Sequence, residues 1–548
     1  MRFATICLLG GLCALPTAGI AQFRELPPPP AYVLQNVTVV HPDGRVETGT
    51  DIVVRRGLIE SMGGTIEIPG DALLLEGDSL WIYPGIVDAH GAADVAFPEI
   101  ERSDSVRSWH APRDIQGFLA HRRVADYLDE EGAAANEQRA KGIVASGILP
   151  RGGMAAGLGA AILHRRGVTR AWQLVVNDNI GLAMAFEGGQ GVYPATLFGV
   201  IAYLRQSFED AKRDALVRQV HADHPGTIGL PGFDPDYAVL QRAMAGEILV
   251  FFAANGAEDI RRVLDLADEY GFSPVVVGGH EAWRVADELA RRDIPVIVDG
   301  DFPEPDEWEP DEPESDSVVQ AKPLEPGAAR EKKRIEDIRS NAGRLAAAGV
   351  RFAIASGNGD GDILEATRLS IEYGLSPDVA LRAITAVPSD LLGIGPVARL
   401  EPGSPATFIA ATGPLFEDDV EIAHTFVEGG YEEGNGGSGG DAPTVNVTGD
   451  WTFTMTSGEM EFELESTLTM DPDGTFRGSV ANAQFGTAPM RGRVSGASMN
   501  FTITISFGGQ SIELSGRGSV EGDRISGNGE SQFGAFTMTG ERDPGGAG

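Results

Sequence analysis

The spacing of apolar and polar residues divides the chain into three stretches. From Tyr32 to Ile82, apolar and polar residues alternate in short runs separated by glycine and aspartate turns, which is typical of strands with one buried face. From Gly85 to about Gly393, short apolar runs alternate with amphipathic segments of helical length. From Val445 to Arg542 the strand-like alternation returns. We therefore expect a small β unit, a large α/β unit and a second β unit.

The middle stretch predicts repeated strand–helix units. A strand at 248–253 is followed by a helix at 257–270, and a strand at 352–355 is followed by a helix at 362–373. Repeats of this kind favour a parallel sheet covered by helices, and at this length a (β/α)8 TIM-like barrel is the leading architecture. The units between them have predicted strands at 274–277 and 294–298 and predicted helices at 281–291 and 328–348.

The last stretch, 445–548, follows a glycine-rich, acidic linker at 431–444. Its pattern predicts about eight short strands separated by turns, which fits an antiparallel, lipocalin-like β-barrel. Such a barrel either holds an apolar ligand or is filled by its own side chains, and the filled barrel is the favoured interpretation.

The first residues, 1–21, have the order of features of a secretory signal peptide. Arg2 precedes an apolar run from Phe3 to Leu15 that is too short to span a bilayer, and small residues follow it. Both cysteines of the chain lie in this segment, so the mature protein would have no disulfide, thiolate nucleophile or cysteine-type zinc site. We expect a periplasmic or secreted protein that has no membrane association after cleavage.

The formal net charge is −37. This charge argues against a nucleic-acid partner, because phosphate binding needs clustered Lys and Arg, and it equally disfavours an anionic membrane surface. A small-molecule ligand stays open as a partner, and the sequence does not determine the oligomeric state. An acidic, proline-rich insert at 299–316 follows the predicted strand at 294–298. We interpret it as a solvated loop, with a lid or a calcium-binding loop as alternatives.

Three segments resemble the amidohydrolase superfamily, in particular its imidazolonepropionase-like branch. Pro84–His90 resembles the start of the family's barrel, Ala383–Ile394 a late barrel helix, and Leu400–Ile409 the return to its β-sandwich. The resemblance covers about 32–430. It implies a barrel at 85–395 and a composite β-sandwich formed by 22–84 and 396–430.

The same resemblance implies hydrolysis of non-peptide carbon–nitrogen bonds by a metal-bound hydroxide. In the family, strand 1 supplies His-x-His, strand 4 a Lys or Glu, strands 5 and 6 a His each, and strand 8 an Asp. Here Asp88 and His90 match strand 1 and are the candidate catalytic residues, while nothing marks the strand 4 ligand. The other family ligands are replaced by Ala92, Ala253, Gly278 and Gly357.

Two hypotheses about function follow. In the first, a single divalent metal such as zinc is held by a rebuilt site of His90, His280 and Asp360 or Asp362, and the protein is a hydrolase. In the second, which we favour for the mechanism, the protein is a metal-free pseudoenzyme that binds a ligand or acts as a scaffold, with impaired or no activity. Asp362 has a simpler interpretation as the cap of the helix that follows. The glycine-rich segment Arg151–Ala160 resembles a family loop that lines the substrate pocket.

Overall fold

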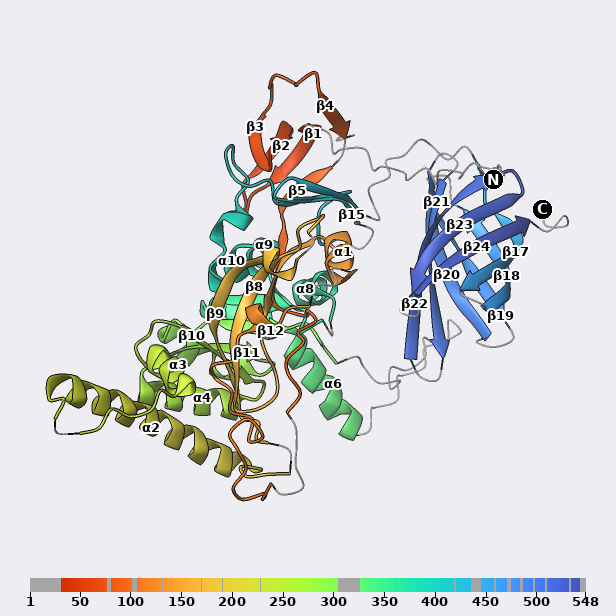
Figure 1. The fold of residues 1–548 in the computed structure, drawn as a ribbon. Coiled ribbons are helices and arrows are strands. Elements are labelled where there is room, and N and C mark those ends of the chain that lie inside the picture. The colour runs from red at the N-terminus through yellow and green to blue at the C-terminus, as the bar shows by residue number, and fades with distance from the viewer. Residues whose placement is uncertain are drawn as a thin grey trace, which may run out of the picture.

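The computed structural model has a mixed α/β barrel, a sheet at one end of it and a separate all-β barrel (Figure 1). The expected signal peptide, Asp360, most of the linker and residues 304–316 of the acidic insert lie outside the described residues. The structure describes residues 31–75, 80–100, 106–129, 133–168, 170–189, 191–226, 228–303, 326–359, 361–417, 420–434, 445–457, 460–470, 475–482, 486–495, 498–507, 510–531 and 534–542.

The first sheet combines strands from both sides of the α/β barrel in the sequence. Its order is β16-β15-β14-β5-β1-β2-β3, with β4 paired to β1. The two parts meet where β5 pairs antiparallel with β14, with Ile82 opposite Ala410. Apolar side chains from both parts form one buried cluster that includes Leu34, Ile52 and Phe426. The strands are β1 (Ala31–Val40), β2 (Val46–Arg55), β3 (Leu58–Gly63), β4 (Ala72–Leu75), β5 (Trp81–Pro84), β14 (Phe408–Ala411), β15 (Ile422–Val427) and β16 (Gly430–Glu433).

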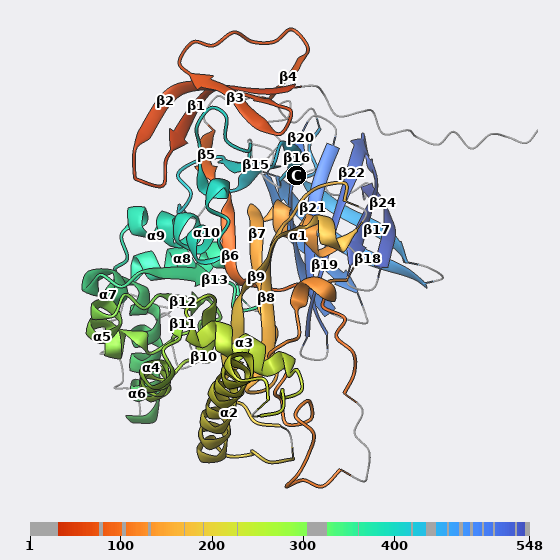
Figure 2. The same ribbon diagram turned by 60° about the vertical axis from the view of Figure 1, so that its left-hand side comes forward.

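The second sheet curls into a nearly closed barrel in the order β13-β12-β11-β10-β9-β8-β7-β6. Because β5 leads directly into β6, the first sheet lies at the end where the barrel strands begin, and the mouth lies at the opposite end (Figure 2). The strands are β6 (Ile86–Gly91), β7 (Ile143–Ile148), β8 (Ala155–Leu163), β9 (Val175–Ala185), β10 (Leu249–Ala254), β11 (Ser273–Gly278), β12 (Val296–Asp299) and β13 (Phe352–Ala355).

One strand departs from the all-parallel barrel that the pattern predicts. Strand β8 is antiparallel to both β7 and β9, whereas the other neighbouring strands are parallel. It contains most of the glycine-rich segment that was expected to be a pocket loop, and it is buried along its whole length. Its glycines serve packing: a Cβ on Gly157 would lie 2.3 Å from the carbonyl oxygen of Arg122, so only glycine lets the two backbones approach.

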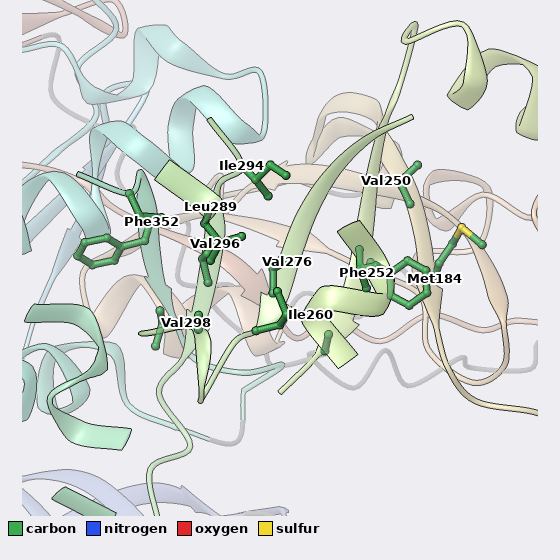
Figure 3. Close-up of a cluster of buried hydrophobic side chains, with 14 of the residues drawn as sticks. Met184, Val250, Phe252, Ile260, Val276, Leu289, Ile294, Val296, Val298 and Phe352 are labelled. Carbon is green, nitrogen blue, oxygen red and sulfur yellow. The ribbon is translucent and has the colours of Figure 1, made fainter. Parts of the chain in front are cut away.

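Helices cover the outer face of the parallel strands. The spacing of Ile260, Val263, Leu264 and Ala267 turns one face of α4 toward the sheet. Figure 3 shows Ile260 and Leu289 from two helices beside Val276 and Val296 from the strands, in one apolar layer. No described helix is long and apolar enough to cross a membrane. The helices are α1 (Ala133–Ala140), α2 (Leu197–Asp223), α3 (Pro235–Met244), α4 (Ala257–Tyr270), α5 (Ala286–Arg291), α6 (Pro326–Arg339), α7 (Asn341–Ala348), α8 (Ile363–Glu372), α9 (Pro377–Ile384) and α10 (Ala386–Leu391), with 3-10 turns at Val124–Asp126, Ala171–Gln173, Ala282–Val285 and Gly395–Ala398.

The C-terminal part is a closed antiparallel barrel in which each strand pairs with the next and β17 also pairs with β24. Alternate side chains point inward and form a buried cluster that includes Trp451, Phe453, Phe501 and Met538. The strands are β17 (Gly449–Ser457), β18 (Met460–Met470), β19 (Thr475–Asn482), β20 (Gly486–Ser495), β21 (Ser498–Phe507), β22 (Gln510–Glu521), β23 (Arg524–Ser531) and β24 (Gly534–Arg542).

Candidate site at the mouth of the barrel

Asp88 lies in β6 and is completely surrounded by protein. Its Oδ1 accepts hydrogen bonds from the backbone N–H groups of His90 and Ser356, both at 3.1 Å. Its Oδ2 accepts one from the Ser356 hydroxyl at 2.6 Å. Burial raises the pKa of the Asp88 carboxyl, and the hydrogen bonds from Ser356 oppose that shift. All these partners belong to the protein itself, so this carboxylate is used within the fold.

These contacts close the barrel. Within the described residues no backbone ladder joins β6 to β13, although the two strands lie side by side. The gap is bridged instead by Asp88 with Ser356 and by the Asn358 N–H, which donates to the carbonyl oxygen of His90 at 2.6 Å. The segment after β13 is therefore drawn in against the end of β6.

Two histidine–carboxylate pairs lie at the mouth. His90 Nδ1 is 2.9 Å from Asp299 Oδ1, and both side chains are largely buried. His280 Nε2 is 3.1 Å from Asp301 Oδ1, and this hydrogen bond holds the pKa of the Asp301 carboxyl below its usual value. The pairs come from the ends of β6, β11 and β12, so three strands deliver them to one face.

Sequence reasoning placed Asp299 and Asp301 in the acidic insert and gave them no role. A signal was present, since the predicted strand at 294–298 ends just before Asp299. Side chains that follow the carboxyl ends of barrel strands meet at the mouth. The many acidic residues that follow in the insert hid this relation. A cation also lies at the mouth: Arg151, just after β7, donates from Nη2 to the carbonyl oxygen of Gly357 at 3.2 Å.

A further buried polar pair lies in the wall of the barrel. His164 Nε2 is 2.8 Å from the Ser146 hydroxyl oxygen, and both residues are buried. Burial, with a smaller contribution from the charge of Arg139, lowers the pKa of His164 to about 3. The imidazole is thus neutral near neutral pH, and we interpret the pair as part of the packing between strands.

Comparison with known proteins agrees with the architecture. Residues 298–432 match the family model described as the amidohydrolase family. The amidohydrolase from Thermotoga maritima MSB8 has a similar fold, with a TM-score of 0.59 and 21% identity, covering 73% of this chain and 99% of that one. Residues 298–432 are thus similar in sequence to the amidohydrolase family, and the chain shares the fold of the Thermotoga amidohydrolase.

One relative among characterised proteins is the amidohydrolase tasK of Hapsidospora irregularis. It is 23% identical to this chain over 257 residues, which are 40% of this chain. The matched residues cover 25% of the length of that relative. This match therefore concerns one part of a larger protein.

The positions that match the family's strand 6 and strand 8 ligands are crowded here, more severely at Gly278 than at Gly357. Gly278 has φ +91°, and a Cβ there would lie 2.2 Å from Asn255 Oδ1. Gly357 has φ +70°, and a Cβ there would lie 3.1 Å from the Cβ of Asp299. Both backbones adopt a left-handed conformation that favours glycine. A ligand side chain at position 278 would thus collide with Asn255, and one at position 357 would be in tight contact with Asp299.

The positions that match the family's ligands in strands 1 and 5 differ in how much space surrounds them. A methyl group on Gly359 would lie 2.9 Å from the methyl group of Ala92, so the segment after β13 runs directly against the position of the second imidazole of strand 1. Ala253, at the strand 5 position, is exposed even though its strand belongs to the barrel. The mouth is thus closed beside β6 and open beside β10.

The residues present do not fit the family's metal centre. Among the described residues, no three His, Cys, Asp or Glu side chains are placed to hold one metal ion. Asp88 is occupied by Ser356, and Asp362 caps α8, where its Oδ1 accepts from the Glu365 N–H at 3.0 Å. His90 and His280 each lie against an aspartate, in two separate pairs.

Proposed function

We propose that this protein binds a small organic molecule at the barrel mouth without a resident divalent metal, and that it is inactive in the metal-hydroxide hydrolysis typical of its superfamily. The observation that carries the proposal is that three of the four positions where the family has metal ligands, Ala92, Gly278 and Gly357, are crowded by neighbouring residues. Asn255 occupies the space at Gly278, and the segment after β13 lies against Ala92. Within the superfamily we assign the chain to the imidazolonepropionase-like branch, on the sequence resemblance over 32–430.

The mouth has features of a ligand site. Ala253 leaves an open apolar surface at the end of β10, and the two histidine–aspartate pairs lie at the same mouth. Binding sites for small molecules commonly combine an apolar lining with a few fixed polar groups that orient the ligand. Asp299 fixes the ring of His90, and Asp301 does the same for His280, so each pair offers a polar group with a set orientation.

The competing candidate is a hydrolase with one metal at His90, His280 and Asp360 or Asp362. In its favour, both histidines follow barrel strands and lie at the same end of the barrel. Against it, the Asp362 carboxylate already accepts the hydrogen bond that begins α8.

Elemental analysis decides between the two. Protein purified without added metal, and again after exposure to zinc and gel filtration, is expected to contain well below one equivalent of any transition metal. About one equivalent per chain, lost in His90→Ala and in His280→Ala but kept in His110→Ala, would establish the metal site and overturn the proposal. His110 is the matched control, because it is an exposed histidine that belongs to neither histidine–aspartate pair.

We also propose that the protein is exported to the periplasm or secreted. The support is the signal-like order of Arg2 and the apolar run Phe3–Leu15. N-terminal sequencing of the protein recovered from the extracytoplasmic fraction is expected to start close to Gln22. A cytoplasmic protein that retains residues 1–21 would contradict export.

A further inference from the structure

A pocket beside the barrel mouth concentrates positive charge in a strongly acidic chain. It has a volume of about 430 Å³ and lies between α6 and the loops that follow β10 and β11. Four cations line it, Arg284, Arg330, Lys333 and Arg334, and we call it the cationic pocket. With a net charge of −37 for the whole chain, such a local excess is not expected from composition.

The carboxylates that line the pocket balance only part of this charge. Asp337 Oδ1 is held by Arg344 at 2.8 Å, and its Oδ2 is 3.6 Å from Lys333. Glu281 Oε2 accepts from the Ala257 N–H at the start of α4 at 3.1 Å, and its other oxygen is 3.7 Å from Arg284. The lining of the pocket therefore has two acidic and four basic side chains. Of the two acidic ones, Asp337 also pairs with a fifth cation, Arg344.

The cations keep the freedom to bind a ligand. Lys333 is 73% exposed and Arg334 is 62% exposed, so their charged groups reach solvent. Arg334 pairs with Glu331 on its own helix, and exposed pairs of this kind contribute little. An incoming anion can replace such a partner and gain hydrogen bonds from a planar guanidinium, which suits carboxylate and phosphate oxygens.

The pocket also adjoins the mouth. Asn255 and His280 line it, and these residues follow β10 and β11 at the end where the His280–Asp301 pair lies. A molecule in the mouth can therefore extend an anionic group past His280 into the pocket. Because the volume falls in the range of about 300–1,000 Å³ that is typical of small-molecule sites, the occupant is a small molecule.

We infer that the cationic pocket binds the carboxylate or phosphate group of the small molecule that occupies the mouth. This inference rests on the proposed function, because it assigns the chemical class of the ligand that the mouth receives. It depends on a separate observation, the charge lining the pocket, and is tested by a separate measurement.

The test is calorimetric titration of the full chain with inorganic phosphate and, in a second arm, with succinate, both at low ionic strength. The wild type is expected to bind at least one of the two, and the stronger arm identifies phosphate or carboxylate as the preferred group. The double variant Arg330→Gln/Arg334→Gln is expected to bind at least about tenfold more weakly, because both lost guanidinium groups face the anion. Arg213→Gln, an exposed arginine on α2, is the matched control and should bind like the wild type.

Two results would overturn the inference: no binding of either anion to the wild type, or equal binding by the wild type and the double variant. If circular dichroism shows that the double variant is unfolded, Arg284→Gln is tested in its place. This variant, which removes a cation outside α6, is also expected to bind the anion more weakly than the wild type. Metal content measured on the same samples separates the two proposals. If the protein contains bound metal and still binds the anion, only the proposed function is contradicted. If the protein is metal-free and does not bind the anion, only this inference is contradicted.

Discussion

Two positions at which the family resemblance predicts metal ligands have a backbone conformation that favours glycine. These residues are Gly278 and Gly357, and both have positive φ angles. A side chain there carries a conformational penalty of about 1–3 kcal/mol before any steric conflict is counted. At Gly278 the side chain of Asn255 adds that conflict. A single substitution to a metal-binding residue at either position would therefore not produce the ligand geometry of the family.

Gly278→His is expected to lower the free energy of unfolding by about 2–4 kcal/mol and to leave the metal content unchanged, because the new side chain meets both a left-handed backbone and Asn255. Ala253→His is the matched control, since its side chain is exposed at the same mouth, and its effect should stay within about 0.5 kcal/mol. Urea unfolding of both variants measures the difference. Equal stability of the two variants would show that the space at Gly278 is not filled as described.

Strands β6 and β13 show how an element can be joined to its neighbour without a ladder. The seam depends on one buried carboxylate, Asp88, and on the hydroxyl and N–H groups of Ser356. A buried charge is costly unless its hydrogen bonds are made, so the loss of one donor here leaves the carboxylate partly unsatisfied. The Asp88–Ser356 contact should therefore contribute more than an ordinary hydrogen bond.

Ser356→Ala is expected to cost about 2–4 kcal/mol of unfolding free energy, because the Asp88 carboxylate loses its shortest hydrogen bond in a site without water access. Ser370→Ala serves as the control: Ser370 is also buried, but its hydroxyl donates to the Ala366 carbonyl oxygen within α8 at 2.8 Å. That change should cost about 1 kcal/mol. The measurement is urea unfolding combined with hydrogen exchange of the 356–359 segment, and similar costs for both variants would argue against the seam.

At the scale of the whole molecule, the apolar cores are separate. The buried cluster of the C-terminal barrel consists of residues between Val445 and Met538, and each of its strands pairs only within the barrel. The first sheet, by contrast, needs chain from both sides of the α/β barrel, because β14 pairs with β5. A unit with its own core and closed hydrogen bonding can fold alone, whereas the first sheet cannot form without residues beyond 400.

A truncated chain of residues 445–548 is expected to unfold cooperatively, with a Trp451 fluorescence spectrum shifted to the blue, because Trp451 is 1% exposed and stacked on Phe453. A truncated chain of residues 31–434 should likewise stay folded, whereas one that ends at residue 400 should not. Calorimetry of the full chain is expected to show more than one transition. A red-shifted, non-cooperative 445–548 would show that its core depends on the rest of the protein.

Much of the α/β unit could be predicted from periodicity alone. The helix expected at 257–270 is α4, and the strand expected at 352–355 is β13, because each has a regular apolar repeat that matches its period. Strand β8 was missed for the opposite reason: its small residues and glycines have little periodicity, and their value lies in letting other backbones approach. The roles of Asp299 and Asp301 were missed because only the barrel brings them to His90 and His280.

By itself the sequence determined the superfamily resemblance and the positions at which that resemblance predicts metal ligands, since both depend on which residues stand in short motifs. Only the tertiary structure decided whether those positions are empty or filled. Residues far apart in the chain, such as Asn255 and Gly278 or Ala92 and Gly359, meet at one mouth. Their proximity follows from the order of the strands in the barrel and not from their spacing in the sequence. The physical reason is that free volume and hydrogen-bond satisfaction are properties of packed neighbours, which a linear pattern does not record.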